Sequence, residues 1–387
     1  MNMKKFQQIM SYVLVALLSA TLSVLLVLGL VGRKEQSKLD ALEELILDRF
    51  IGEADQIFIE DAAADAMVNA LGDRWSYYVP ADQVAALMEQ KNNAYVGIGV
   101  TITTNEDQSG LVITQVTAGG SAEEAGILAG DVIVAVAGKP VAGQSLDEIK
   151  NQIRGEENTQ VEITVERSGK QITAMVARKS IKKQVAIGKM LQDKIGLVRI
   201  ANFNDNCKTE TIAAIEQLLA QGAEKLIFDV RFNGGGAASE LVAILDYLLP
   251  EGPLFRTEDY AGKETVETSD EKCLELPMAV LVNGESYSAA EFFAAALSEY
   301  EAAVVVGEQT SGKGYFQYTY ILPDGSAVGL STGKYYTPNG VSLAQKGIMP
   351  DVMVPVDGET TKAIYAGTLA PESDPQIRAA VNALAGN

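Results

Sequence analysis

The hydrophobic pattern changes several times along this chain, and its first feature is a long uncharged run. Residues 9–31 comprise 23 positions without a charged side chain, most of them Leu, Val and Ala. A helix rising about 1.5 Å per residue spans a bilayer core of ~30 Å over such a length. The run is too long for the core of a typical signal peptide, and no small-residue cleavage site follows it. We therefore expect a cytoplasmic stub and a transmembrane anchor in residues 1–34; a cleaved signal and a buried core helix are the alternatives.

Residues 35–94 have the spacing of polar-faced helices. Apolar side chains recur there at helical intervals: Leu39, Leu42, Leu45 and Ile46. A further helix is predicted over 62–71, followed at 73–78 by an aromatic loop that contains the single tryptophan, Trp75. Aromatic clusters mostly serve packing. The amphipathic part, residues 35–60, is also suited to forming a homodimer.

From Tyr95 onward the pattern becomes that of short strands bounded by Gly, Asn or Asp. Strands are predicted at residues 100–103, 111–116, 132–136 and 161–166. A helix is predicted over 145–153, with Ser145 as its N-cap. The resulting β-rich module, residues 95–170, has the size of a small domain.

The remainder of the chain alternates between strand and helix patterns. Strands are predicted at 195–200, 225–231, 278–283 and 303–307, and helices at 209–221, 237–249 and 288–300. Such alternation favours an α/β layer architecture. We expect this α/β core over residues 171–356, with residues 357–387 as a C-terminal tail associated with it.

Composition narrows the class of protein. A length of 387 residues suggests two or three domains, and a hydrophobic fraction of 47% is ample for packed cores. The net charge of −20 and the lack of a basic patch argue against a nucleic-acid partner. The two cysteines, Cys207 and Cys273, form no C-x-x-C motif. Separate thiols are the simpler interpretation, and a disulfide in an oxidising compartment is the alternative.

The chain contains no histidine. That absence excludes a Ser-His-Asp triad, a Cys-His pair and a His-ligated metal. A hydrolase that acts through a nucleophile must then use another base, for which lysine is the known substitute. No metal and no cofactor is expected.

One candidate nucleophile lies where a predicted strand, residues 278–283, runs through a tight loop into a helix. Ser288 is placed at the start of that helix, where free N–H groups and the helix dipole favour developing negative charge. The N–H of Ala289 is positioned to help bind an oxyanion. The competing interpretation is that Ser288 only caps the helix, which is the usual role of serine at this position.

A glycine turn follows another predicted strand, at residues 234–236 within the segment 229–236. Glycines allow backbone to approach a ligand closely and direct N–H groups toward it. The turn therefore suits a second oxyanion donor or the wall along which a substrate strand lies. A simple turn with positive φ is the alternative; the phosphate-binding glycine motifs are incomplete here.

Lys313 is the candidate base. A lysine acts as a base near neutral pH only if burial lowers its pKa. Apolar residues precede it at 304–306, Tyr315 and Phe316 follow it, and Gln317 is placed to orient the amine through its amide oxygen. A solvent-exposed loop lysine is the common alternative.

These segments together resemble the carboxy-terminal processing peptidases, also called tail-specific proteases, of the Ser-Lys class. Residues 286–291 fit the family's S/T-A-S-A-S-E frame, and residues 307–317 fit G-x-x-T-x-G-K-G-x-x-Q. Further matches are residues 229–236, 334–340 and 347–351. The resemblance implies Ser288 as nucleophile, Lys313 as general base and Gln317 as the residue that orients the lysine. It also implies an oxyanion hole, which we place at the N–H groups of Gly235 and Ala289.

The β-rich module resembles the PDZ domain of the same family. The carboxylate-binding loop corresponds to Val96, Gly97, Ile98 and Gly99, preceded by Tyr95. Residues 125–127 and 130–133 fit the usual helix and strand landmarks. Such a groove binds a peptide carboxy-terminus by strand addition.

The resemblance implies a multidomain α/β protein with a ClpP/crotonase-like protease core. The expected activity is that of a membrane-anchored serine endopeptidase, on the extracytoplasmic side, that cleaves proteins bearing exposed C-terminal tails. A catalytically silent PDZ scaffold is one rival, against which the intact Ser288, Lys313 and Gln317 argue. A crotonase-like acyl-CoA enzyme is the other, against which the PDZ module and the anchor argue. Four departures from the family pattern leave every catalytic group in place: Gly234, Glu285, Tyr287 and Val341.

Overall fold

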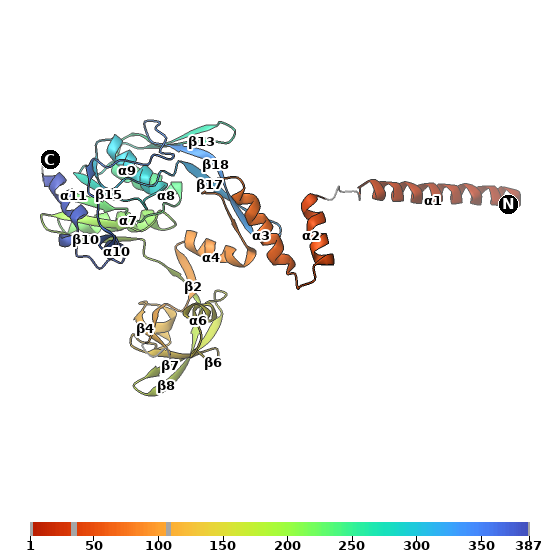
Figure 1. The fold of residues 1–387 in the computed structure, drawn as a ribbon, viewed down its shortest axis with the longest axis horizontal. Helices are drawn as coiled ribbons and strands as arrows, with labels where there is room; N and C mark the ends of the chain where they lie inside the picture. The colour runs from red at the N-terminus through yellow and green to blue at the C-terminus, as the bar shows by residue number, and fades with distance from the viewer. Residues whose placement is uncertain (1–2, 32–36, 106–109, 386–387) are drawn as a thin grey trace. The chain divides into compact units, whose positions relative to one another are not determined.

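The structure, a computed structural model, describes residues 3–31, 37–105 and 110–385, and divides into units 1–72 and 73–387 (Figure 1). The first unit is helical: α1 (Met3–Val31), α2 (Lys38–Arg49) and α3 (Gln56–Asn69). Ser37 begins α2 with a capping box, in which its hydroxyl accepts from the Asp40 N–H and the Asp40 carboxylate accepts from the Ser37 N–H. The predicted helical region, residues 35–94, contains α2 and α3 and also includes strand residues from 77 to 79.

The predicted membrane anchor over residues 9–31 falls on helix α1. In the part of the chain that the structure describes, no helix is long and apolar enough to cross a membrane, so this expectation is not confirmed. Residues 32–34, expected to close the anchor, lie outside the described residues.

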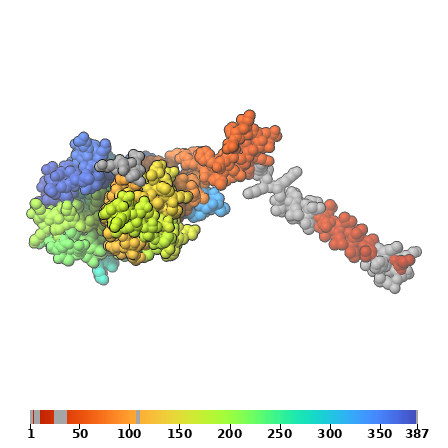
Figure 2. Space-filling view, turned by 90° about the horizontal axis from the view of Figure 1, so that it is seen from below, coloured from red at the N-terminus to blue at the C-terminus, as the bar shows by residue number. Residues whose placement is uncertain are grey.

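The second unit opens with β1 (Tyr77–Val79), α4 (Ala81–Lys91) and β2 (Ala94–Gly97). The β-rich module follows, and its rounded body is yellow to yellow-green in Figure 2. Its elements are β3 (Val100–Thr104), β4 (Leu111–Val116), α5 (Ser121–Glu124), β5 (Val132–Val136), β6 (Lys139–Pro140), α6 (Leu146–Ile153), β7 (Gln160–Arg167) and β8 (Lys170–Ala177). The strands pair in the order β3-β4-β5-β7-β8 around their own apolar core. The module therefore has a core separate from that of the remaining chain.

A predominantly parallel sheet forms the centre of the second core, with strand order β10-β11-β12-β15-β16-β19. The strands are β10 (Ala186–Met190), β11 (Ile195–Ile200), β12 (Lys225–Asp229), β15 (Met278–Val282), β16 (Ala303–Gly307) and β19 (Val352–Met353). All pairs are parallel except β10 with β11. Every side chain of β15 is buried, as expected for a parallel strand covered on both faces.

Helices cover both faces of this sheet. The helices are α7 (Cys207–Ala220), α8 (Ala238–Leu248), α9 (Ala289–Glu299), α10 (Gly358–Tyr365) and α11 (Pro375–Ala385), with a 3₁₀ turn η1 (Pro371–Ser373). Val280 and Val282 of β15 pack into one core with α7, α8 and α9, whereas Ala279 and Leu281 pack into another with α11. Cys207 is buried within the first of these cores, and neither cysteine is disulfide-bonded.

A second, antiparallel sheet adjoins the site described below. It pairs β1 with β18 (Ala327–Tyr336), β18 with β13 (Gly252–Asp259) and β17 (Tyr315–Ile321), and β13 with β14 (Glu264–Ser269). A separate ribbon joins β2 to β9 (Lys179–Lys182). Through β1, the sheet brings the loop at residues 73–76 beside β18, more than 250 positions later in the chain.

Candidate active site

Three of the segments singled out in the sequence leave the central sheet at the same edge. The parallel strands β12, β15 and β16 are neighbours and end at Asp229, Val282 and Gly307. The carboxyl ends of parallel strands meet at one edge of a sheet, where α/β proteins place their binding sites. The glycine turn, the serine segment and the lysine loop therefore converge.

The loops after β12 and β15 are locked together by buried hydrogen bonds. Asn283 Oδ1 accepts from the N–H groups of Phe232 (2.9 Å) and Glu285 (3.2 Å). The hydroxyl of Ser286 donates to the Val230 carbonyl at 2.7 Å and is fully buried. Ser286 is thus a structural serine, and it fixes the loop that presents the next serine, Ser288.

Ser288 stands at the N-terminus of α9 in an unusual conformation. Its φ and ψ are 59° and −127°, a region of backbone conformation that residues other than glycine rarely adopt. The residue is 5% exposed. Backbone strain of this kind costs on the order of 1–3 kcal/mol and persists only where the surroundings hold it. The Ser288 N–H donates to Glu291 Oε2 at 2.9 Å, which supplies part of that hold.

Gly235 lies directly against the serine. A Cβ added at this position would lie 2.8 Å from the Ser288 Cβ and 2.9 Å from the Ala289 nitrogen, and φ is +85°. Only glycine allows this approach. The Gly235 N–H donates to Asn233 Oδ1 at 2.8 Å, so it is already paired in this arrangement. The oxyanion role of Gly235 and Ala289 stays a prediction, and for Gly235 it requires that this bond open.

Glu291 connects the serine segment to the lysine loop. It is fully buried, and its Oε1 accepts from the Thr310 hydroxyl (2.5 Å) and the Gly312 N–H (2.8 Å). Its Oε2 accepts from the N–H groups of Ser288 and Lys313, each at 2.9 Å. Burial raises the pKa of Glu291 despite these hydrogen bonds. One carboxylate thus fixes the backbone of the candidate nucleophile relative to that of the candidate base.

The side chain of Lys313 is largely buried. Burial lowers its pKa to about 8, against the opposing charges of Asp73 and Glu291. Its Nζ lies 4.7 Å from the ring centre of Trp75 and 5.8 Å from that of Tyr287. The neutral amine is therefore more accessible near neutral pH than that of an exposed lysine.

The other groups of the candidate site have partners of their own. The Gln317 amide nitrogen donates to Ser331 Oγ (2.9 Å) and to the Tyr315 carbonyl (3.2 Å). Burial raises the pKa of Tyr335, and the neighbouring Ser288 side chain partly opposes that rise. Among the described residues, no hydrogen bond joins the side chain of Lys313 to that of Ser288 or Gln317. The structure therefore brings the predicted groups into one site without completing their hydrogen-bonded chain.

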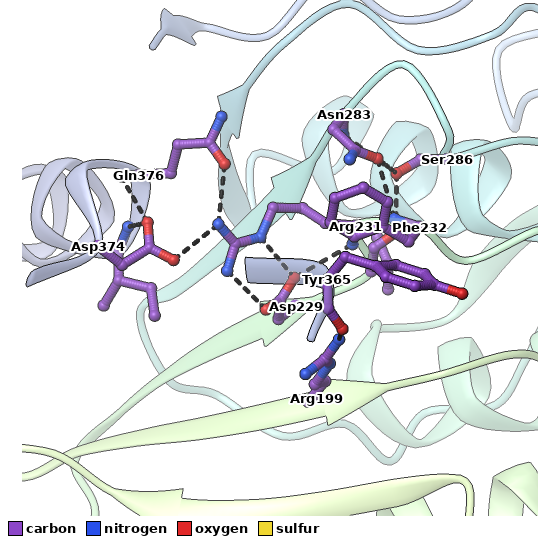
Figure 3. A network of polar contacts seen from close by, with 11 residues as sticks. Arg199, Asp229, Arg231, Phe232, Asn283, Ser286, Tyr365, Asp374 and Gln376 are labelled. Atoms are coloured by element: carbon purple, nitrogen blue, oxygen red, sulfur yellow. Dashed lines mark hydrogen bonds and ion pairs between the residues drawn. The ribbon is translucent and has the colours of Figure 1, made fainter. Parts of the chain in front are cut away.

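A buried ion-pair network anchors this edge of the sheet (Figure 3). The Arg231 guanidinium donates to Asp229 Oδ2 at 2.7 Å and to Asp374 Oδ2 at 2.8 Å, and Gln376 Oε1 also accepts from it. All three charged side chains are almost fully buried. The segment that contains Asp374 and Gln376 is thereby fixed to the turn that leads to Gly235.

In the β-rich module, a groove of about 290 Å³ lies between β3 and the end of α6. Gly97, Ile98 and Gly99, three of the four predicted loop residues, line it together with Tyr95 and Arg154. Val96 belongs, like Gly97, to β2 and pairs with Ser180 of β9, but it is not part of the lining. The groove is therefore at the place expected for a peptide terminus, with Val96 outside its lining.

Comparison with known proteins gives the family. Residues 194–354 match Peptidase family S41, and residues 112–167 match a PDZ domain. A probable CtpA-like serine protease of Staphylococcus aureus (strain N315) is 30% identical over 366 residues, which cover 91% of this chain and 73% of the relative. The chain therefore belongs to peptidase family S41 and carries a PDZ domain.

Two further relatives have a similar sequence identity to this chain and match a similar share of it. The probable CtpA-like serine protease of S. aureus strain COL is 32% identical over 331 residues, 84% of this chain and 66% of the relative. The carboxy-terminal processing protease CtpA of Bacillus subtilis (strain 168) is 30% identical over 363 residues, 90% of this chain and 78% of the relative. The chain thus spans between 66% and 78% of the length of these proteins. The solved photosystem II D1 C-terminal processing protease is 29% identical, with 84% of this chain and 89% of that chain covered and a TM-score of 0.47.

Sequence reasoning missed three residues of the site. In the sequence, Glu291 was noted only as the last residue of the segment 286–291 and Tyr335 only as part of the segment 334–340. Trp75 was interpreted as an aromatic residue that serves packing. The signal for Glu291 was its position three residues after Ser288, the spacing of a capping box. For Tyr335 and Trp75 no local signal existed, because their contacts depend on the antiparallel sheet.

Proposed function

We propose that this protein is a serine endopeptidase that cleaves proteins near their C-termini, with Ser288 as nucleophile and Lys313 as general base. One observation carries the proposal: Glu291 binds the backbone of both residues at a sheet edge, with Ser288 strained at a helix N-terminus and Lys313 largely buried. Strained residues and lowered lysine pKa values concentrate at catalytic sites.

The proposed reaction has two steps. Neutral Lys313 accepts the proton of the Ser288 hydroxyl as Oγ attacks the carbonyl carbon of the peptide bond. The tetrahedral intermediate collapses when the C–N bond breaks, and the lysine ammonium gives its proton to the leaving amine. Water then attacks the acyl carbon while Lys313 takes its proton; the C–Oγ bond breaks, the new C-terminus leaves, and Lys313 returns the proton to Ser288 Oγ. The Ala289 N–H at the start of α9 is the proposed donor to the oxyanion.

Three groups must change partners before this reaction can start. Lys313 Nζ must leave the aromatic rings, the Ser288 hydroxyl must bond to that nitrogen, and Gln317 must turn its amide toward the amine. The N–H of Gly235 becomes a second oxyanion donor only if it leaves Asn233. We therefore propose that the arrangement described is a resting one.

Substrate selection is assigned to the PDZ domain. Its groove is lined by Gly97, Ile98 and Gly99, beside the edge strand β3. Such an edge binds an extended peptide by strand addition, with backbone N–H groups at its carboxylate. Proteins with exposed, unstructured C-termini are thus the proposed substrates.

A location at the membrane, with the peptidase on the extracytoplasmic side, is a further proposal supported by sequence alone. The uncharged residues 9–31 are flanked by Lys4 and Lys5 before and Arg33 and Lys34 after. Retention in the membrane fraction after alkaline carbonate washing supports this proposal, and quantitative release contradicts it.

The activity is tested with an unstructured protein that ends in an apolar tail. We expect the full chain to cut it near its C-terminus, and to cut the same protein with an amidated terminus at least ten times more slowly, because the carboxylate contact is lost. Mass spectrometry of the products gives the cleavage positions. Binding of the tail without any cleavage would contradict the proposal and favour a scaffold.

A further inference from the structure

Two aromatic rings meet at the side chain of Lys313. The rings of Trp75 and Tyr287 lie with their centres 5.4 Å apart, tilted by 39°. The lysine Nζ is 4.7 Å from the first centre and 5.8 Å from the second. Both distances fall within the range in which a ring face attracts an ammonium group.

Each ring is held by its own local structure. The backbone N–H of Trp75 donates to Asp73 Oδ1 at 3.1 Å, and β1 begins two residues later. The backbone N–H of Tyr287 donates to the Asn233 carbonyl at 3.1 Å. The Tyr287 hydroxyl lies 2.5 Å from the point that a Cβ on Gly234 would occupy. Gly234 and Tyr287 both depart from the family pattern, and the two departures depend on each other, because any side chain at 234 would displace the Tyr287 ring.

We propose that Trp75 and Tyr287 form an aromatic cage that binds the protonated Lys313 side chain, holds it away from Ser288 and sets the pH at which the base becomes available. Trp75 and Tyr287 are then positioning residues for the lysine. This inference rests on the proposed function in one respect. The cage controls peptidase activity only if Lys313 is the general base, whereas the binding of the lysine by the two rings does not depend on that role.

Charged groups also face the lysine from each neighbouring element. Asp73 from the loop before β1 and Glu291 from α9 favour the ammonium form, whereas burial and Arg74 oppose it. The Arg74 guanidinium lies 4.1 Å from the centre of the Trp75 ring. The rings add an attraction for the charged form while excluding water. Replacing a ring with an aliphatic side chain of similar bulk removes the attraction and keeps the site dry, so the pKa of Lys313 is expected to fall.

The first test is the pH dependence of kcat/KM. In the wild type, kcat/KM is expected to fall as pH decreases through about 8, because Lys313 becomes protonated. In Trp75→Leu and Tyr287→Leu this acidic limb of the pH profile, the fall in kcat/KM on acidification, should move to lower pH by about 0.5 to 1 pH unit. The matched variants Trp75→Phe and Tyr287→Phe keep a ring and should shift it less. A limb that stays in place or moves upward in both Leu variants would overturn the cage.

The second test does not require proteolysis. Trp75 is the only tryptophan of the chain, so intrinsic fluorescence reports on the ring that faces Lys313. We expect the emission of the wild type to titrate with a midpoint near the pKa of Lys313, about 8, and this titration to vanish in Lys313→Met. A titration that survives in Lys313→Met refutes the cage. An intact titration in a protein that cleaves nothing supports the cage and counts against the proposed peptidase activity.

Discussion

Replacement of Lys313 by methionine is expected to reduce kcat/KM for cleavage of a tailed protein by about 10³-fold or more. Methionine keeps the unbranched, apolar stem of the lysine and is one atom shorter, so it fills most of the same space beside Trp75. It offers no nitrogen to accept the Ser288 proton, and the chain has no histidine that could replace the lost base. The loss should therefore appear in kcat with the fold intact.

The control for this variant is Lys346→Met, which removes an exposed lysine from a nearby segment. Its activity is expected to remain within twofold of the wild type. Circular dichroism and thermal unfolding of both variants establish that each is folded. If Lys313→Met keeps more than a tenth of the wild-type rate, another group acts as the base.

Replacement of Glu291 by glutamine is expected to impair both activity and stability. The carboxylate accepts four hydrogen bonds through two oxygens, three of them from backbone N–H groups. Glutamine keeps one acceptor oxygen and presents an NH₂ group to donors that then have no partner. Leaving buried donors unsatisfied costs roughly 1–3 kcal/mol each. We expect the free energy of unfolding to fall by roughly 3 kcal/mol.

The effect of Glu291→Gln on kcat should be about 10²-fold, because Ser288 and Lys313 lose the group that fixes their separation. Urea unfolding and peptidase assays under one set of conditions measure both quantities. Glu301→Gln, an exposed acidic residue just after α9, is the matched control and should change neither. Normal kcat in a destabilised Glu291→Gln protein would show that the carboxylate serves only the fold.

The central sheet could be predicted closely from the sequence, for a physical reason. Strands β11 and β16 were expected at their observed bounds, since parallel strands buried on both faces appear as short continuous apolar runs. The antiparallel sheet was not predicted. Its strands β14 and β17 are mostly exposed or half-buried, so their pattern lacks a strong apolar signal, and the pairing of β1 with β18 joins distant segments.

For the candidate site, too, one part could be predicted from the sequence and another part could not. Ser288 and Lys313 could be located because each sits in a local motif, and the sheet topology then explains why they converge. Their present partners could not be predicted, because the Trp75 ring reaches Lys313 only through tertiary structure. For the glycine turn at 234–236, the sequence left close backbone approach and a simple turn with positive φ as alternatives, and the bond of Gly235 to Asn233 has no sequence signature beyond the spacing of two residues.

Trapping of the acyl-enzyme tests the central claim most directly. The full chain is mixed with a tailed substrate, quenched in acid within the first turnover and digested for mass spectrometry. We predict an acyl adduct on Ser288 in the wild type and no adduct in Ser288→Ala or Lys313→Met. An adduct on another residue, such as Ser286, or substrate cleavage that persists in Ser288→Ala, would contradict the assignment of Ser288 as the nucleophile.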